Sequence, residues 1–193
     1  MPLVALALCG AAAASEWTTY EQKKGATFEQ RDVAGSSYHE FRASIELAVD
    51  ADAAAAFIWT VATDPASTKT VHKKVVRSAA DEVVIYQQMF LPAVSDRDVT
   101  LRLWKLPTSA DGTREVRWES ANDQGPGPEK RFVRMTAVRG TWTVKPTVGG
   151  KVQIVFVTFS EPGGSVPAVF VRGPQKDRAA VDFWGVVDKL ARP

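Results

Sequence analysis

The chain has 193 residues, of which 45% are hydrophobic and 24% charged, a composition typical of one globular domain with a sizeable core. Its 24 Lys and Arg residues nearly balance its 22 Asp and Glu residues, so the formal net charge is only +2. This balance gives no electrostatic reason to expect binding to nucleic acid or to an anionic membrane surface. Beyond the N-terminus, no segment of the sequence reaches the run of about 20 apolar residues that a membrane-spanning helix needs.

The first 14 residues form an apolar segment that differs from the rest of the chain. The opening MPLVALALCGAAAAS ends in the small residues 12–14 before Ser15, a pattern typical of the apolar core and cleavage site of a signal peptide. We therefore predict a signal peptide over residues 1–14 and one exported domain, periplasmic or secreted, over residues 15–193. The alternative is an alanine-rich N-terminal helix of a cytoplasmic protein, because no Lys or Arg precedes the apolar run.

Cys9 is the single cysteine and lies inside this leader. The sequence around it loosely resembles a bacterial lipoprotein signal, which would allow a lipid anchor at Cys9. However, Leu8 occupies a position where such signals carry a small residue. If the leader is removed, the mature chain has no cysteine, which excludes disulfides, thiol catalysis and Cys-ligated metal sites within it.

Two helices and two strands are predicted in the first third of the domain. In chain order these are a short amphipathic helix at 16–25, strands at 28–33 and 36–47, and a helix at 50–63. Gly25 is a plausible C-cap for the first helix. In the second strand His39 shares the apolar parity, which predicts a half-buried strand. Asp50 or Asp52 can cap the alanine-rich helix, and Asp64-Pro65 ends it.

From residue 81 onward the sequence reads as one strand after another. The predicted strands cover residues 81–92, 97–107, 114–121, 131–146 and 152–160. Residues 122–130 form a loop by composition, Gly140 marks a bulge or bend, and 148–151 is a hairpin turn. The last strand is apolar on both faces, so we expect it at the centre of the sheet.

A long helix is predicted at the C-terminus, after Pro162 ends the last strand and Gly163-Gly164 turns the chain. Ser165 can cap this helix, and Gly173-Pro174 should kink it. After the kink, one apolar stripe is formed by Ala180, Phe183, Trp184, Val187 and Ala191. Hairpin-length connections imply an antiparallel sheet, and such a sheet, curved around one long helix, leaves a hollow unless large side chains fill it.

Three motifs in this order resemble a known family. They are LPAVSDRDVTLRLW at 91–104, RFVRMTAVRGTWTVKP at 131–146 and FSEPGGSVPAVFV at 159–171. From Trp17 to the C-terminus the sequence resembles the START (steroidogenic-acute-regulatory-protein-related lipid transfer) domains of the helix-grip superfamily. The resemblance implies an α+β helix-grip fold, in which a curved antiparallel sheet wraps around the C-terminal helix and encloses a hydrophobic cavity.

The resemblance also implies a function. START domains bind one hydrophobic molecule, such as a sterol or phospholipid, without catalytic residues, and the C-terminal helix acts as a lid. We accordingly expect a monomeric binding protein, not an enzyme, with a lipid or sterol-like ligand, no cofactor and transient membrane contact. The candidate lid hinges are Gly163, Gly164, Gly173 and Pro174.

Strand alternation and the abundance of aromatic residues suggest which side chains line the cavity. The predicted set is Tyr86, Gln88, Phe90, Leu101, Leu103, Trp118, Arg134, Met135, Phe156, Phe183, Trp184 and Val187. In some START relatives a buried Arg–acid pair orients the ligand, but here the matching position carries Leu103, and Arg102 faces the other way. An error of one residue in the strand parity would exchange the two faces.

The polar residues offer few alternatives to a binding function. His39 and His72 are the only histidines, and neither has a carboxylate or cysteine at metal-ligand spacing, so we predict no metal site. Asp96 and Asp98 could hold a cation or perform acid–base chemistry, but Arg97 between them favours a structural, salt-bridged start of a strand.

Two other functions remain open at this stage. An enzyme with the same fold, such as a polyketide cyclase or aromatase, would need at least two of the groups His39, Asp96, Asp98 and Arg134 to converge inside the pocket. A pure interaction module would have a filled core without a cavity.

Overall fold

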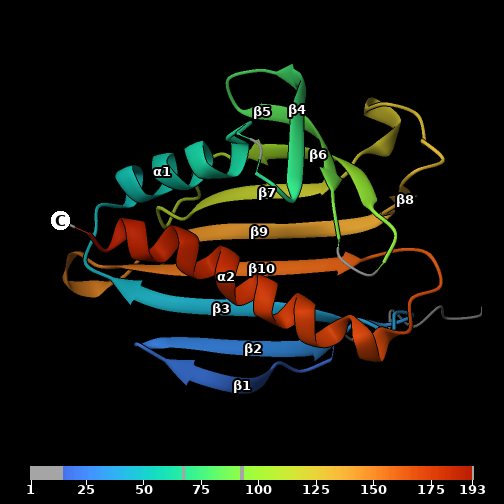
Figure 1. Ribbon diagram of the computed structural model, residues 1–193. Coiled ribbons are helices and arrows are strands. Elements are labelled where there is room, and N and C mark those ends of the chain that lie inside the picture. The colour runs from blue at the N-terminus through green and yellow to red at the C-terminus, as the bar shows by residue number, and fades with distance from the viewer. Residues whose placement is uncertain (1–14, 67, 92–93, 193) are drawn as a thin grey trace, which may run out of the picture.

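The computed structural model describes residues 15–66, 68–91 and 94–192 of the chain (Figure 1). The predicted leader at 1–14, with Cys9, lies outside the described residues. The described part forms one large sheet whose strands follow the spatial order β1-β2-β3-β10-β9-β7-β6-β5-β4, with β8 pairing to β6. All neighbours are antiparallel except the short β6–β8 pair. The strands are β1 Thr18–Lys23, β2 Ala26–Asp32, β3 His39–Leu47, β4 Val71–Ser78, β5 Glu82–Met89, β6 Arg97–Lys105, β7 Arg114–Ser120, β8 Val133–Arg134, β9 Ala137–Pro146 and β10 Val152–Glu161.

Two α-helices cover one face of this sheet, which we call the inner face; the opposite face is the outer face. The helix α1 (Ala51–Thr63) begins at Asp50, whose carboxylate accepts a hydrogen bond from the Ala53 N–H at 2.8 Å. It packs against β7 and β9. The helix α2 (Arg172–Leu190) crosses the sheet and contacts β3 and α1 (Figure 1). The predicted α+β helix-grip fold is confirmed, and β10 lies at the centre of the sheet as predicted.

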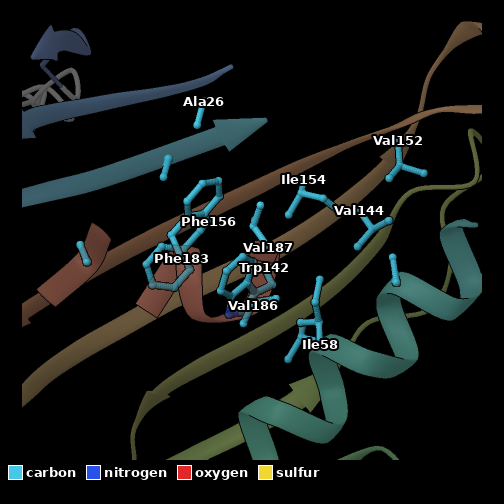
Figure 2. Close-up of a cluster of buried hydrophobic side chains, with 14 of the residues drawn as sticks. Ala26, Ile58, Trp142, Val144, Val152, Ile154, Phe156, Phe183, Val186 and Val187 are labelled. Atoms are coloured by element: carbon cyan, nitrogen blue, oxygen red, sulfur yellow. The ribbon is translucent and has the colours of Figure 1, made fainter. Parts of the chain in front are cut away.

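Aromatic side chains hold α2 against the inner face. The rings of Phe183 and Trp142 are stacked with their centroids 6.1 Å apart, and Trp142 contacts Phe156 at 4.4 Å. Phe28 meets the Phe183 ring edge-on at 5.5 Å. Figure 2 shows Trp142, Phe156 and Phe183 in the same cluster as Val186 and Val187 of α2. Burying an aromatic or aliphatic side chain of this size contributes about 1.5–3 kcal/mol, so this contact is the main support of α2.

The N-terminal segment at 17–25 is a strand and a turn, so its prediction as a helix is wrong. Lys24 and Gly25 turn the chain with φ values of 50° and 81°, and β1 pairs with β2. In β1 only Tyr20 is partly buried, next to an irregularity in the register. Because Tyr20 is the only partly buried residue of β1, the sequence of this strand shows no alternation of apolar and polar residues. The pairing of β1 with β2 overrides its weak helical pattern.

The edge strand β4 was not predicted from the sequence. None of its residues is buried, and it pairs only with β5. A register irregularity between Val75 and Arg77 further disturbs its alternation. Charged residues and a bulge are usual on an edge strand, where they discourage pairing with other chains.

The predicted strand at 131–146 is divided into β8 and β9, because the chain changes its pairing partner. β8 runs parallel to the start of β6, whereas β9 lies between β7 and β10. Gly140 does not form the predicted bulge, because its register with β10 is continuous. It is instead a point of close approach: a Cβ there would lie 2.1 Å from Cζ2 of Trp118 and 2.4 Å from the Val157 carbonyl oxygen.

The helix α2 is continuous, so the kink predicted at Gly173-Pro174 is wrong. Pro174 lies in the first turn, where a missing N–H removes no intrahelical hydrogen bond. Ser165 does not cap α2, because a short 3₁₀ turn at Ala168–Phe170 intervenes. The stripe is also rotated: Ala179, Phe183, Val186 and Val187 are buried, whereas Ala180 and Trp184 are only partly buried. This rotation follows from packing against α1 as well as against the sheet.

We predict that Gly140→Ala lowers the free energy of unfolding by about 1–3 kcal/mol, because the added methyl group overpacks the contact with Trp118. Gly185→Ala in α2 is the matched control, since a Cβ there meets nothing within 4 Å. That change should stabilise the protein by up to about 1 kcal/mol through helix propensity. Urea unfolding of both variants tests the prediction, and an equal response at the two positions would contradict it.

Candidate functional site

The predicted cavity residues are divided between the two faces of the sheet. In the β5–β6 pair Ile85 lies opposite Leu101, and Tyr86 lies opposite Thr100. Cross-strand partners share a face, so Tyr86 is on the opposite face from Leu101. The prediction that Tyr86 and Gln88 share a face with Leu101 and Leu103 is therefore wrong. The cause is that residues 83–86 are all buried, so β5 shows no alternation from which parity could be read.

One group of predicted residues lies under α2 on the inner face. The rings of Trp118 and Phe156 stack with centroids 5.8 Å apart, and Phe156 belongs to the same cluster as Phe183 and Val187. Trp184 packs at the border of this cluster, 5.9 Å from Phe28. These side chains fill the space between α2 and the centre of the sheet.

A second group lies on the inner face beside the first, on β5, β6 and the chain after β8. Leu101, Leu103 and Met135 form a buried cluster with Val83, Ile85 and Val99. Trp59 and Ala62 of α1 and Trp118 of β7 pack against it. This second cluster lies on strands β5 and β6, toward the β4 edge of the sheet. The helix α2 contacts β3, which lies toward the opposite edge.

The third group, Tyr86, Gln88 and Arg134, lies on the outer face around a carboxylate. Asp98 is fully buried and accepts two hydrogen bonds from Arg134, at 2.8 Å and 2.7 Å. The Tyr86 hydroxyl donates to the same carboxylate at 2.9 Å and accepts from the Gln88 amide at 3.3 Å. Sequence parity did not bring Asp98 and Arg134 together, because β8 pairs with β6 in parallel after a long connection.

This network shifts two ionisation equilibria. Burial raises the pKa of the Tyr86 hydroxyl above its ordinary value, and the hydrogen bond to Asp98 adds to this effect. The hydrogen bond to Asp98 also raises the pKa of the Arg134 guanidinium, against the opposing effect of burial. The two pKa shifts favour a neutral Tyr86 hydroxyl and a positively charged Arg134 guanidinium.

The connection between β7 and β8 closes the outer face over this pair. Arg134 donates to the carbonyl oxygens of Pro126 and Gly127, both at 3.1 Å. At Gly125 a Cβ would lie 1.9 Å from the Thr100 hydroxyl oxygen, so only glycine lets the loop cross β6 so closely. This cover explains why residues 97–101 are buried without alternation.

The segment Asp96-Arg97-Asp98 joins three parts of the molecule at one end of the sheet. Asp96 accepts from the Leu91 N–H at 3.1 Å and lies 3.6 Å from Arg131. Asp98 binds Arg134, as described above. The segment is thus a salt-bridged start of β6, as predicted, although its partners are Arg131 and Arg134, not the intervening Arg97.

A hollow of about 600 Å³, open to solvent, lies at this end of the sheet. We call it the β6–α2 hollow. It is lined by Val94, Ser95, Arg97, Val133, Gly164, Ser165 and Val166. Gly163 and Gly164, two predicted hinge residues, adopt φ values of 69° and 67° beside it. The other two, Gly173 and Pro174, lie inside α2.

A second hollow lies on the outer face, between β4, β5 and β6. Its two arginines, Arg77 and Arg102, both bind Glu82, at 2.5 Å and 2.6 Å. The predicted residue Phe90 lies near this edge of the sheet, where its ring contacts His72 at 4.7 Å and Phe132 at 6.0 Å. Phe90 is therefore separate from the inner-face clusters.

The remaining polar candidates do not assemble with one another. His39 Nδ1 lies 2.9 Å from the Asp32 carboxylate, at the far side of β10 from Asp98. Within residues 15–66, 68–91 and 94–192, no three side chains of the types His, Cys, Asp and Glu are grouped so that they could hold a metal ion. No helix of the described part is long and apolar enough to cross a membrane.

Known proteins share this arrangement of sheet and helices. No family model matches the chain. An uncharacterized protein of Pseudomonas aeruginosa is 26% identical over 166 residues, covering 83% of this chain and 80% of that protein. A STAR-related lipid transfer protein of Xanthomonas axonopodis superimposes with a TM-score of 0.75 at 24% identity, over 91% of this chain and 99% of that structure. The chain has the START fold.

A human protein has a similar fold. Human StAR-related lipid transfer protein 5 superimposes with a TM-score of 0.68 at 15% identity, over 91% of this chain and 88% of that structure. Because the coverage is nearly complete in both directions, the START fold includes the sheet and the C-terminal helix. The resemblance predicted from the three sequence motifs is confirmed at this level.

We predict that Asp98→Asn lowers the free energy of unfolding by about 3–5 kcal/mol, because it leaves the largely buried Arg134 without a counter-charge. Asp96→Asn is the matched control: its pair with the exposed Arg131 is longer, and its loss should cost about 1 kcal/mol or less. Chemical denaturation of both variants measures the difference. Equal losses would contradict the assignment of Asp98 as the central charge.

We also predict an alkaline effect that depends on Tyr86. The pKa of Tyr86 is raised above 10.0 in the folded protein, so its contribution to stability is complete below pH 10 and is lost as the pH rises beyond that value. Tyr86→Phe should therefore lose less free energy of unfolding than the wild type between about pH 8 and about pH 11. Tyr38→Phe, outside the network, serves as the control. An identical decline in the wild type and Tyr86→Phe would contradict the prediction.

Proposed function

We propose that this chain binds one hydrophobic small molecule, such as a lipid or a sterol, on the inner face of its sheet, beneath the two helices. The observation that carries this proposal is the START fold, shared with lipid transfer proteins over nearly the whole chain. It is supported by the continuous apolar surface formed by the two inner-face clusters. Each CH₂ group of a ligand buried there would contribute about 0.8 kcal/mol to binding.

We further propose that α2 moves when a ligand enters, because the aromatic cluster fills the space beneath it. The hinge is placed at Gly163 and Gly164 in preference to Gly173 and Pro174, which lie inside a continuous helix. The N-terminal part of α2 is held by polar contacts that can be exchanged with water. These include hydrogen bonds from Arg172 to the Ser37 carbonyl and from Gln175 to the Ser160 carbonyl.

Loading at the β6–α2 hollow would involve brief contact with a membrane. Exposed apolar side chains lie on the segments around the hollow: Leu91 and Val94 between β5 and β6, and Val169 before α2, which is 75% exposed. Such side chains can enter the boundary of a lipid layer without spanning it. We propose that the domain meets this membrane after export, guided by the predicted leader at 1–14.

The enzyme alternative would require polar groups that converge on the ligand. Asp98 and Arg134 do meet, but on the outer face, where each satisfies the other under the β7–β8 connection. His39 is paired with Asp32 on the far side of β10. Asp96 is paired with Arg131. The four candidate groups of the enzyme alternative therefore do not converge in one pocket, and they give it no specific support.

Lipid binding is tested by native mass spectrometry of the purified protein, followed by identification of extracted lipids and titration with a fluorescent lipid probe. We expect a bound hydrophobic molecule and saturable binding. Leu101→Asn should weaken probe binding at least about tenfold, because it puts an amide on the proposed ligand surface. Val84→Asn is the matched control, since Val84 is also buried but lies on the outer face, opposite Arg102. Absence of both extractable lipid and saturable binding would overturn the proposed function.

A further inference from the structure

Arg97 is a buried cation that has no carboxylate partner among the described residues. Arg97 is only 2% exposed. Nε donates to the Pro162 carbonyl at 3.3 Å, and Nη1 donates to the Ser95 carbonyl. Among residues 15–66, 68–91 and 94–192, no carboxylate oxygen lies within 4.0 Å of the Arg97 guanidinium nitrogens, and Nη2 has no hydrogen-bond acceptor.

The neighbouring acids do not neutralise this charge. Asp96 is engaged with Arg131 and with the Leu91 N–H, and Asp98 is engaged with Arg134 on the outer face. A buried charge without a counter-ion is costly, and most proteins pair it. In the outer-face hollow, by contrast, the arginines have an acidic partner, because Arg77 and Arg102 both pair with Glu82.

Arg97 lies on the inner face of the sheet, at the edge of the β6–α2 hollow. Arg97 is paired with Met89 across β5, and Met89 packs on the β5–β6 apolar cluster. Arg97 also lines the hollow, together with Ser165 and the proposed hinge residue Gly164. Arg97 thus lines the hollow, and its cross-strand partner Met89 packs on the apolar cluster.

Side chains of the same parity continue from Arg97 along the inner face of β6. Val99, Leu101 and Leu103 follow at intervals of two residues, and all three are buried. From Arg97 to Leu103 a strand extends about 20 Å. Each leaflet of a bilayer is about 15 Å deep in its hydrocarbon part, so this row is long enough for one extended acyl chain.

We propose that Arg97 binds the anionic headgroup of the ligand, and that the ligand is an acidic amphiphile whose chain lies along Val99, Leu101 and Leu103. The headgroup is a carboxylate or a phosphate monoester, since both accept paired hydrogen bonds from a guanidinium. This inference rests on the proposed function and specifies its ligand class. The headgroup would supply the counter-charge that Arg97 lacks, and the Ser165 hydroxyl lines the same hollow.

The test compares ligands that share a palmitoyl chain and differ only at the head. Palmitic acid is paired with methyl palmitate, and palmitoyl lysophosphatidic acid with monopalmitoylglycerol, each displacing a fluorescent lipid probe from the full chain. We expect the wild type to prefer at least one acid over its neutral partner by at least about tenfold. Which acid is preferred distinguishes a carboxylate headgroup from a phosphate.

Arg97→Gln should remove most of this preference while changing the affinity for the neutral partner by no more than about twofold. Arg97→Lys, which keeps the charge but not the planar fork, should retain part of it. Arg131→Gln is the matched control, because Arg131 is exposed at the same end of the sheet, and it should keep the wild-type preference. Circular dichroism verifies folding of each variant.

Three outcomes would overturn the inference. The first is equal binding of acids and neutral partners by the wild type, which needs no variant. The second is an undiminished preference in folded Arg97→Gln, and the third is an equal loss of preference in Arg131→Gln. If the wild type binds none of the four amphiphiles and no other lipid probe, the proposed function itself fails; binding of neutral lipids without a headgroup preference overturns only the assignment of Arg97.

Discussion

The ion pair between Asp98 and Arg134 fixes the end of the sheet on which the candidate site depends. Asp98 is fully buried, and its charge is balanced by two hydrogen bonds from Arg134. The pair anchors β8 to β6, and the β7–β8 connection is hydrogen-bonded to the same guanidinium. The backbone of β8 in turn supports the turn after β10, since a Cβ at Gly163 would lie 3.0 Å from the Arg134 carbonyl oxygen. The buried charge pair therefore lies next to residues that line the β6–α2 hollow, since Arg97 and Val133 precede Asp98 and Arg134 directly in the chain.

The start of β6 uses its two faces for different purposes. On the outer face Asp98 closes a satisfied polar network, which stabilises the fold. On the inner face Arg97 lines the hollow, and the buried residues Val99, Leu101 and Leu103 follow it at the same parity. Alternation along a strand makes this separation possible within two consecutive residues. Two consecutive residues of β6 thus make separate sets of contacts on the two faces of the sheet.

The packing beneath α2 defines how a ligand could be accommodated. Stacked aromatic rings between the helix and the centre of the sheet leave the helix well supported. A ligand must therefore displace these contacts or lie beside them, on the β5–β6 side of the inner face. The β5–β6 surface is apolar and lies next to the hollow. The length of a ligand's chain and the charge of its headgroup would therefore both affect its affinity for this surface.

Local features of the sequence were sufficient for much of the fold. Asp50 marks the start of α1, and Pro65 follows its end. The apolar strand β10 lies centrally, and the Pro-Gly-Gly sequence after it ends the sheet. These features could be predicted because helix capping, strand alternation and turn formation depend on a few neighbouring residues. The three motifs of the sequence were enough to predict the START fold. The outward direction of Tyr86 and Arg134, their contact with Asp98, and the burial of Arg97 without a carboxylate partner in the described part emerge only when the chain is folded. The reason is physical: residues 83–86 of β5 and 97–101 of β6 are buried without alternation, so their parity cannot be read from the sequence, and the β6–β8 pairing joins residues far apart in the chain.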